Sequence, residues 1–127
     1  MPGGGRIMTT ASRVEVKGER RGDVLLLHIR GRLDALSSEL AEKEVFSFLH
    51  QGPRNVLLDF TEVNYLSSAG MRMLLAIFKQ VKSVSGKLAV CSVEDGVLDV
   101  LKMSGFDEVL EVFATQDEAL KRLAKGE

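Results

Sequence analysis

The stretch VNYLSSAGMRMLL, residues 63–75, joins an apolar run to a long helical pattern. Upstream, residues 55–60 (NVLLDF) are nearly all apolar, which is typical of a strand covered on both faces and paired in parallel. Two hydroxyls and two small residues follow, so either Ser67 or Ser68 can cap the first free N–H groups of a helix. The sequence therefore predicts a strand-to-helix junction here, with the strand in the centre of the sheet.

The two serines allow two interpretations. Serine is common before a helix, so the simpler one is that they are caps alone. The start of a helix also favours negative charge, so a phosphate on either hydroxyl would be tolerated by the fold while changing the surface shown to a partner. The local sequence leaves both open.

The helix expected from about Ser68 to Ser83 has a wide apolar face. Its core-facing positions by spacing are Met71, Leu74, Leu75, Phe78 and Val81, widened by Met73 and Ile77, with Arg72, Lys79, Lys82 and Ser83 around the other side. Such width suits a deeply packed helix. It also suits an exposed contact patch beside the serines.

The rest of the chain alternates between the apolar pattern of strands and that of helices. Residues 14–17 and 24–29 predict an antiparallel pair joined by a charged turn, and a crossover helix follows with Ser37 or Ser38 as its cap and Gly52-Pro53 at its end. Strands are expected over 87–93 and 109–113, with a short helix between them that ends at Ser104-Gly105. Residues 115–118 (TQDE) form a capping box for a terminal helix. This alternation predicts an α/β fold.

Composition excludes several classes of protein. The 127 residues carry a net charge of −1, which gives no field to gather nucleic acid or an anionic membrane, and no apolar run is long enough to span a bilayer. A basic cluster at Arg13, Lys17, Arg20 and Arg21 lacks interleaved aromatic residues and is interpreted as a solvated turn beside an edge strand. We expect a disordered tail over residues 1–13, one domain over residues 14–127, and a cytoplasmic location without a signal peptide.

Catalytic and metal-binding patterns are sparse. Cys91, the one cysteine, lies in an apolar run and is expected to be a buried thiol, and the two histidines have no metal-ligand spacing. Ser68, His28 and Asp59 could form a catalytic triad only if the fold brought them together. We instead expect Asp59 to serve for capping or charge balance at a strand end and assign no chemistry to His28. The sequence thus favours a non-catalytic interaction module that needs no cofactor.

Several motifs resemble the STAS domain of bacterial anti-sigma factor antagonists. The run LDF–VNYLSSAGM, residues 58–60 and 63–71, is similar to the family's strand leading into Asp-Ser-Ser/Thr/Ala-Gly-Leu. Further similarities are GRLD (31–34), GKLAV (86–90), MSGF (103–106) and EAL (118–120), in the family's order. The likeness spans roughly residues 14 to 124. Ser67 stands where the family has its usual Asp.

The resemblance implies a fold, a partner and a switch. The fold is a single STAS-like domain with a mixed β-sheet, an antiparallel edge and about four flanking helices. The partner is an anti-sigma factor that is also a Ser/Thr kinase of the histidine-kinase-like ATPase fold, and binding it releases a sigma factor.

The family's switch maps onto the serine pair. Its phosphorylated serine aligns with Ser68, with Ser67 as the alternative, and a metal-dependent Ser/Thr phosphatase reverses the modification. The expected partner-binding residues are Ser67, Ser68, Ala69, Gly70, Met71 and Arg72. The other function that this resemblance allows is a non-catalytic STAS subunit that regulates or scaffolds a transporter or signalling complex, with purely structural serines.

Overall fold

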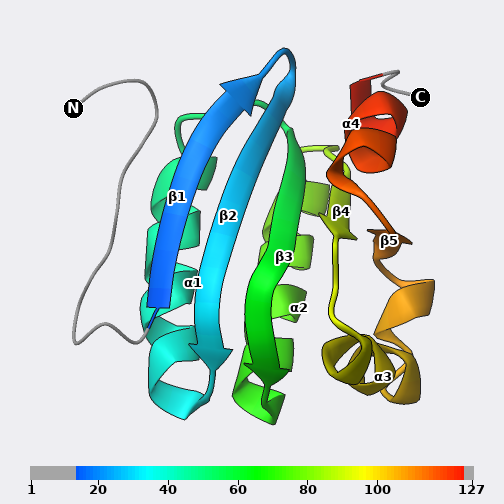
Figure 1. The fold of residues 1–127 in the computed structure, drawn as a ribbon. Helices are drawn as coiled ribbons and strands as arrows, with labels where there is room; N and C mark the ends of the chain where they lie inside the picture. The colour runs from blue at the N-terminus through cyan, green and yellow to red at the C-terminus, as the bar shows by residue number, and fades with distance from the viewer. Residues whose placement is uncertain (1–13, 125–127) are drawn as a thin grey trace.

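The computed structural model describes residues 14–124, so the expected tail over residues 1–13 lies outside the described part. The described chain forms five strands and four α-helices (Figure 1). The strands are β1 (Val14–Arg21), β2 (Val24–Leu33), β3 (Asn55–Leu66), β4 (Leu88–Cys91) and β5 (Glu111–Phe113). The helices are α1 (Ala35–Leu49), α2 (Ser68–Ser83), α3 (Asp95–Met103) and α4 (Gln116–Ala124), with a 3-10 turn η2 (Phe106–Glu108) before β5.

The strands form one mixed sheet in the order β1-β2-β3-β4-β5. β1 pairs antiparallel with β2, and the remaining neighbours are parallel. The predicted antiparallel edge and the central position of β3 are therefore confirmed. Lys17, Arg20 and Arg21 lie on the edge strand β1 and its turn, as interpreted from the sequence.

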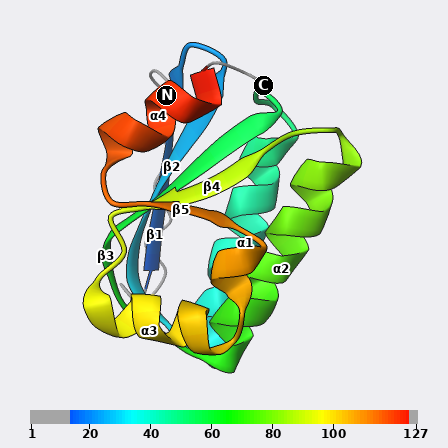
Figure 2. The same ribbon diagram turned by 90° about the vertical axis from the view of Figure 1, so that its right-hand side faces the viewer.

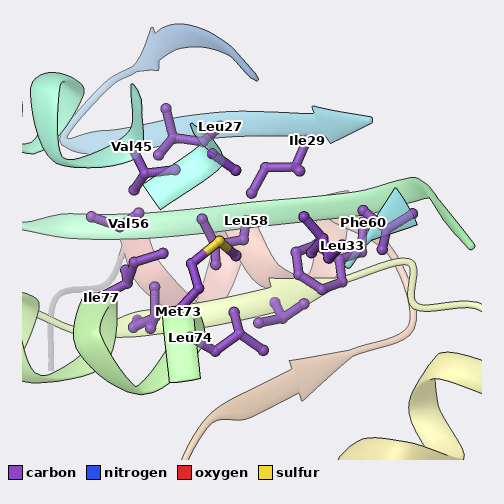
Figure 3. Packing of buried hydrophobic residues seen from close by; sticks show 14 of the residues in the cluster. Leu27, Ile29, Leu33, Val45, Val56, Leu58, Phe60, Met73, Leu74 and Ile77 are labelled. Carbon is purple, nitrogen blue, oxygen red and sulfur yellow. The ribbon is translucent and has the colours of Figure 1, made fainter. Parts of the chain in front are cut away.

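Helices cover both faces of the sheet unequally (Figure 2). α1 and α2 lie side by side on one face, α3 closes one end of that layer, and α4 lies on the opposite face. The main core fills the space between the sheet and α1, α2 and α3, and Figure 3 shows Leu58 and Phe60 of β3 facing Met73 and Leu74 of α2. A smaller cluster beneath α4 includes Leu57, as expected for a strand buried on both faces.

The packing confirms one expectation about side chains, for Cys91, and corrects another, for Leu75. Cys91 is fully buried in the smaller cluster, and burial, with the charge of Asp59, raises the pKa of its thiol to about 11. On α2, the buried apolar side chains are Met73, Leu74, Ile77 and Val81. The prediction that Leu75 faces the core is wrong, because α2 is rotated so that Leu75 lies at the solvent edge, 37% exposed.

The expected cap of α1 is also wrong. Asp34 is the N-cap, and its Oδ1 accepts a hydrogen bond from the N–H of Ser37 at 2.9 Å. Ser37 Oγ in turn accepts from the N–H of Asp34 at 3.0 Å, which completes a capping box. Ser37 and Ser38 are therefore inside the helix and buried. For α4, Thr115 Oγ1 accepts from the N–H of Glu118 at 3.1 Å, as the predicted cap requires.

Candidate functional site at the start of helix α2

The junction quoted from the sequence forms a sharp turn from β3 into α2. Ser67 has extended backbone angles (φ −90°, ψ 176°), and its Oγ accepts a hydrogen bond from the N–H of Gly70 at 3.2 Å. α2 begins at Ser68. Of the two serines that the sequence allowed as caps, Ser67 is the one used.

Ser67 also ties the junction to the end of β2. Its Oγ donates to the carbonyl of Leu33 at 2.7 Å, and its backbone N–H donates to the same oxygen at 3.0 Å. The hydroxyl thus donates one hydrogen bond and accepts another, so its proton and one lone pair are engaged. Ser67 is only partly exposed and is held in place by the fold.

The close approach of α2 to the end of β2 also explains why residue 70 is a glycine. A Cβ at this position would lie 2.5 Å from Leu66 Cδ1 and 3.2 Å from the carbonyl oxygen of Leu33. Any side chain would push the first turn of α2 away from β2. Gly70 is buried, so the role expected for it in partner binding is limited to letting the first turn of α2 lie close to the end of β2.

Ser68 has the opposite environment. It is exposed, and its hydroxyl makes no hydrogen bond with any residue in 14–124. The neighbouring side chains differ from one another: Ala69 and Met71 are partly buried, whereas Arg72 is exposed. Met71 packs against the main core, so the surface expected from the sequence is made chiefly by Ser68, Ala69 and Arg72.

A groove of about 540 Å³ lies between the first turns of α1 and α2. Its lining consists of Ala35, Leu36, Ser38, Glu39, Glu42, Ala69 and Arg72. Leu36 is 50% exposed, and Arg72 shares the groove with the carboxylates of Glu39 and Glu42. The sequence analysis missed the α1 residues of this groove. The signal that could have found them is Leu36, an apolar residue that lies outside the apolar stripe of its own helix and is therefore expected to be exposed.

The strand ends beside the junction add an aromatic contact. The Arg32 guanidinium lies 4.2 Å from the centre of the Tyr65 ring, and Tyr65 is 39% exposed. Arg32 and Tyr65 are register partners of β2 and β3. A cation–π pair at an exposed site favours this arrangement of the two side chains by about 0.5–1 kcal/mol.

The expectation that Asp59 lies at a strand end is wrong. β3 continues to Leu66, and the buried Asp59 accepts hydrogen bonds from Thr61 Oγ1 at 2.6 Å, Thr61 N at 2.9 Å and Gln116 Nε2 at 2.8 Å. Burial alone would raise the pKa of this carboxyl, but the bonds from Thr61 and Gln116 and the charge of His28 outweigh it and hold the pKa below its ordinary value.

His28 lies between two carboxylates of neighbouring strands. Its Nδ1 is 3.4 Å from Asp59 Oδ2, and its Nε2 is 3.0 Å from Glu19 Oε2. The hydrogen bond from His28 is the largest cause of the lowered pKa of Glu19. His28 thus links β1, β2 and β3 through its contacts with Glu19 and Asp59.

The triad weighed from the sequence does not assemble. His28 and Asp59 are register partners, but Ser68 lies beyond the end of β3, whose last residue, Leu66, is already roughly 23 Å from Asp59 along the strand at about 3.3 Å per residue. Within residues 14–124, no group of three or more histidine, cysteine, aspartate or glutamate side chains could hold a metal ion. No helix of this part of the chain is long and apolar enough to cross a membrane.

The fold and the junction together define a small α/β domain with a mixed sheet and an exposed serine at the start of the helix after its central strand. This is the architecture that the sequence resemblance implied. The chain belongs to the STAS domain family, whose model matches residues 15–119.

Known proteins similar to this chain agree with that assignment. A Bordetella bronchiseptica protein, BtrV, described as an anti-sigma factor antagonist, is 31% identical over 96 residues, which cover 76% of this chain and 83% of that protein. A crystal structure of a Thermotoga maritima protein with the same description has a TM-score of 0.80 at 25% identity and covers 84% of this chain and 92% of that one. The unphosphorylated form of the anti-sigma factor antagonist SpoIIAA has a TM-score of 0.74 at 20% identity, with 87% and 96% coverage, and shows the shared fold.

Proposed function

We propose that this protein is an anti-sigma factor antagonist. It binds a kinase-type anti-sigma factor through the surface around Ser67 to Arg72 and so releases a sigma factor, and phosphorylation of Ser68 ends the binding. The names of its relatives support the general role. The observation that carries the proposal is the contrast between the two serines: Ser67 is used by the fold, and Ser68 is exposed and free for a partner.

The chemistry at Ser68 fits a phosphoryl acceptor. Transfer of the γ-phosphoryl group of ATP to Ser68 Oγ forms the phosphoserine and releases ADP, and the hydroxyl proton goes to a base of the kinase. The product carries about −1.5 to −2 charges and lies at the first residue of α2, where the helix dipole stabilises an anion. The fold therefore tolerates the phosphate while the contact surface becomes strongly acidic.

The presence of Ser67 where the family usually has Asp has a structural explanation. The position needs an N-cap, and serine and aspartate are comparably good at it. Ser67 therefore keeps the capping bond to Gly70 while removing a negative charge beside Ser68. We propose that this makes the cognate kinase and phosphatase recognise a less acidic site than in most of the family.

The serine assignment predicts a clear difference between two alanine variants. With the cognate anti-sigma kinase and ATP, Ser68→Ala is expected to lose phosphate incorporation and Ser67→Ala to retain it. Ser67→Ala should also lower the free energy of unfolding by about 1 kcal/mol, because it loses a cap, whereas Ser68→Ala should change it little. Incorporation of labelled phosphate and chemical denaturation measure the two effects. Phosphorylation that persists in Ser68→Ala and vanishes in Ser67→Ala would move the switch to Ser67.

The binding surface predicts a second result. Arg72→Glu and Leu36→Asp are expected to weaken binding to the anti-sigma factor at least about tenfold, since each puts a carboxylate into the groove, and 1.4 kcal/mol corresponds to tenfold in affinity. Both side chains are exposed, so the variants should keep their thermal stability. Met71→Asp is a poorer probe, because Met71 packs against the core.

Titration calorimetry measures this effect, and Lys79→Glu, an exposed position farther along α2, is the matched control. Unchanged affinity in both folded groove variants would contradict the proposed surface. That result would favour the alternative, a STAS subunit of a transporter or signalling complex.

The remaining parts of the proposal follow from this role. We propose that residues 14–127 act as one non-catalytic domain in the cytoplasm, where sigma factors work. A metal-dependent Ser/Thr phosphatase would restore the active form. The likeness to a Wolinella succinogenes sulfate transporter family protein, with a TM-score of 0.72 at 22% identity, shows the fold alone.

A further inference from the structure

Arg72 lies one helical turn after Ser68 on α2, and both side chains are exposed. Residues four apart are neighbours on a helix surface, with Cβ atoms about 5–6 Å apart. Arg72 lines the groove beside Ala69, the residue after Ser68, and because helical side chains lean toward the N-terminus its guanidinium is within reach of a phosphate on Ser68. An anion at the first position and a cation four residues later is the favourable order for such a pair.

The Arg72 guanidinium is not committed to another group. Within residues 14–124, no carboxylate lies within 4.0 Å of it, and it contacts no aromatic ring as Arg32 does. It shares the groove with Glu39 and Glu42, so it faces acidic side chains without being paired to them. Its five N–H donors are available for a stronger acceptor.

We propose that Arg72 is the built-in counter-ion of phosphorylated Ser68. This proposal rests on the proposed switch. The guanidinium donates N–H hydrogen bonds to two phosphoryl oxygens along its own helix, and such charge-assisted pairs are about twice as strong as neutral hydrogen bonds. The positive end of the α2 dipole also favours the phosphate.

The pairing changes the groove as well as the serine. Arg72 is the basic side chain among the described groove residues, and Glu39 and Glu42 are the acidic ones. When the phosphate binds Arg72, the partner loses a cation that it could contact, and two carboxylates remain beside a new anion. Phosphorylation therefore removes a favourable contact and adds a repulsive one, which gives a larger change in affinity than the phosphate charge alone.

The test uses the full chain with phosphoserine genetically encoded at position 68, so no kinase is needed. The second phosphate ionisation is followed by 31P NMR as a function of pH at low salt. In the wild-type background the midpoint is expected about 0.3–0.6 pH unit lower than in Arg72→Gln, because the guanidinium favours the dianion. Arg72→Lys should recover part of the shift, and added salt should reduce it.

Lys79→Gln is the matched control, since it removes the same charge from an exposed position of α2, 11 residues from Ser68. Its midpoint should stay close to that of the wild type. Equal midpoints for wild type and Arg72→Gln would overturn the counter-ion, and so would an equal shift in Lys79→Gln, which indicates a general charge effect. Neither outcome depends on whether a kinase modifies Ser68, so failure of this inference is distinct from failure of the proposed function.

Discussion

Replacing Gly86 by alanine is expected to lower the free energy of unfolding by about 3 kcal/mol, or roughly 10 °C in Tm. A Cβ at this position would lie 2.1 Å from the carbonyl oxygen of Arg54 and 2.9 Å from its carbonyl carbon. These are backbone atoms just before β3, and the adjoining Lys87 carbonyl accepts a hydrogen bond from the N–H of Val56 at 2.9 Å. Relief of the clash must therefore shift the start of β3 or of β4.

Gly96→Ala is the matched control for this prediction. Gly96 lies inside α3, and the nearest atom to an added Cβ is Glu94 Oε1 at 3.7 Å. Alanine is a better helix former than glycine by up to about 1 kcal/mol, so this variant should be neutral or slightly more stable. Chemical denaturation of both variants measures the difference. Similar stabilities for the two would show that the turn before β4 adjusts without cost.

Replacing Asp59 by alanine is expected to destabilise the protein by about 2 kcal/mol. The change removes a buried acceptor, 6% exposed, that the Thr61 N–H and hydroxyl and the Gln116 amide share, and water replaces only part of these bonds because Thr61 is exposed and Gln116 is half-buried. Gln116 is the first residue of α4, so contact between this helix and the sheet weakens as well. Asp59→Asn should lose less, because its amide oxygen still accepts from Thr61.

The effect of Asp59 also depends on pH. The folded state holds the pKa of Asp59 below its ordinary value of 3.8, so the ionised carboxylate stabilises the fold above that pH. This stabilisation is lost as pH falls below about 4 and passes through the folded pKa. The difference in stability between wild type and Asp59→Asn should therefore be largest near neutral pH and shrink below pH 4.

Denaturant unfolding at several pH values measures this dependence. Asp99→Asn, an exposed position on α3, should show no comparable loss. A difference between wild type and Asp59→Asn that is independent of pH down to the acid transition would contradict an ionised, hydrogen-bonded Asp59.

The α2 junction places residues that the fold uses beside residues whose side chains are exposed, within one motif. Ser67 and Gly70 serve the fold, through the cap and through close approach to Leu33. Ser68 and Arg72 have exposed side chains that the fold does not use. A change at the first pair is expected to alter stability, and a change at the second to alter binding or its control.

The sequence by itself determined the order and the kind of the elements. The nearly continuous apolar run from Val56 to Phe60, interrupted only by Asp59, correctly predicted a central strand, because a strand covered on both faces carries mostly apolar side chains. Helical spacing predicted α2, and the landmark motifs indicated the family. These features depend on neighbours within a few residues, which is why they can be read along the chain.

Only the tertiary structure decided the side chains whose partners are distant in sequence. Ser67 was distinguished from Ser68 by the Leu33 carbonyl, 34 residues away. Asp59 lies inside β3 because the pairing with β2 continues to Leu66, and its carboxylate accepts a hydrogen bond from Gln116, 57 residues away. The groove exists because α1 and α2 lie side by side and bring Leu36 to Arg72. Periodicity reports which face of an element is apolar, but it carries no information about which distant atom that face meets.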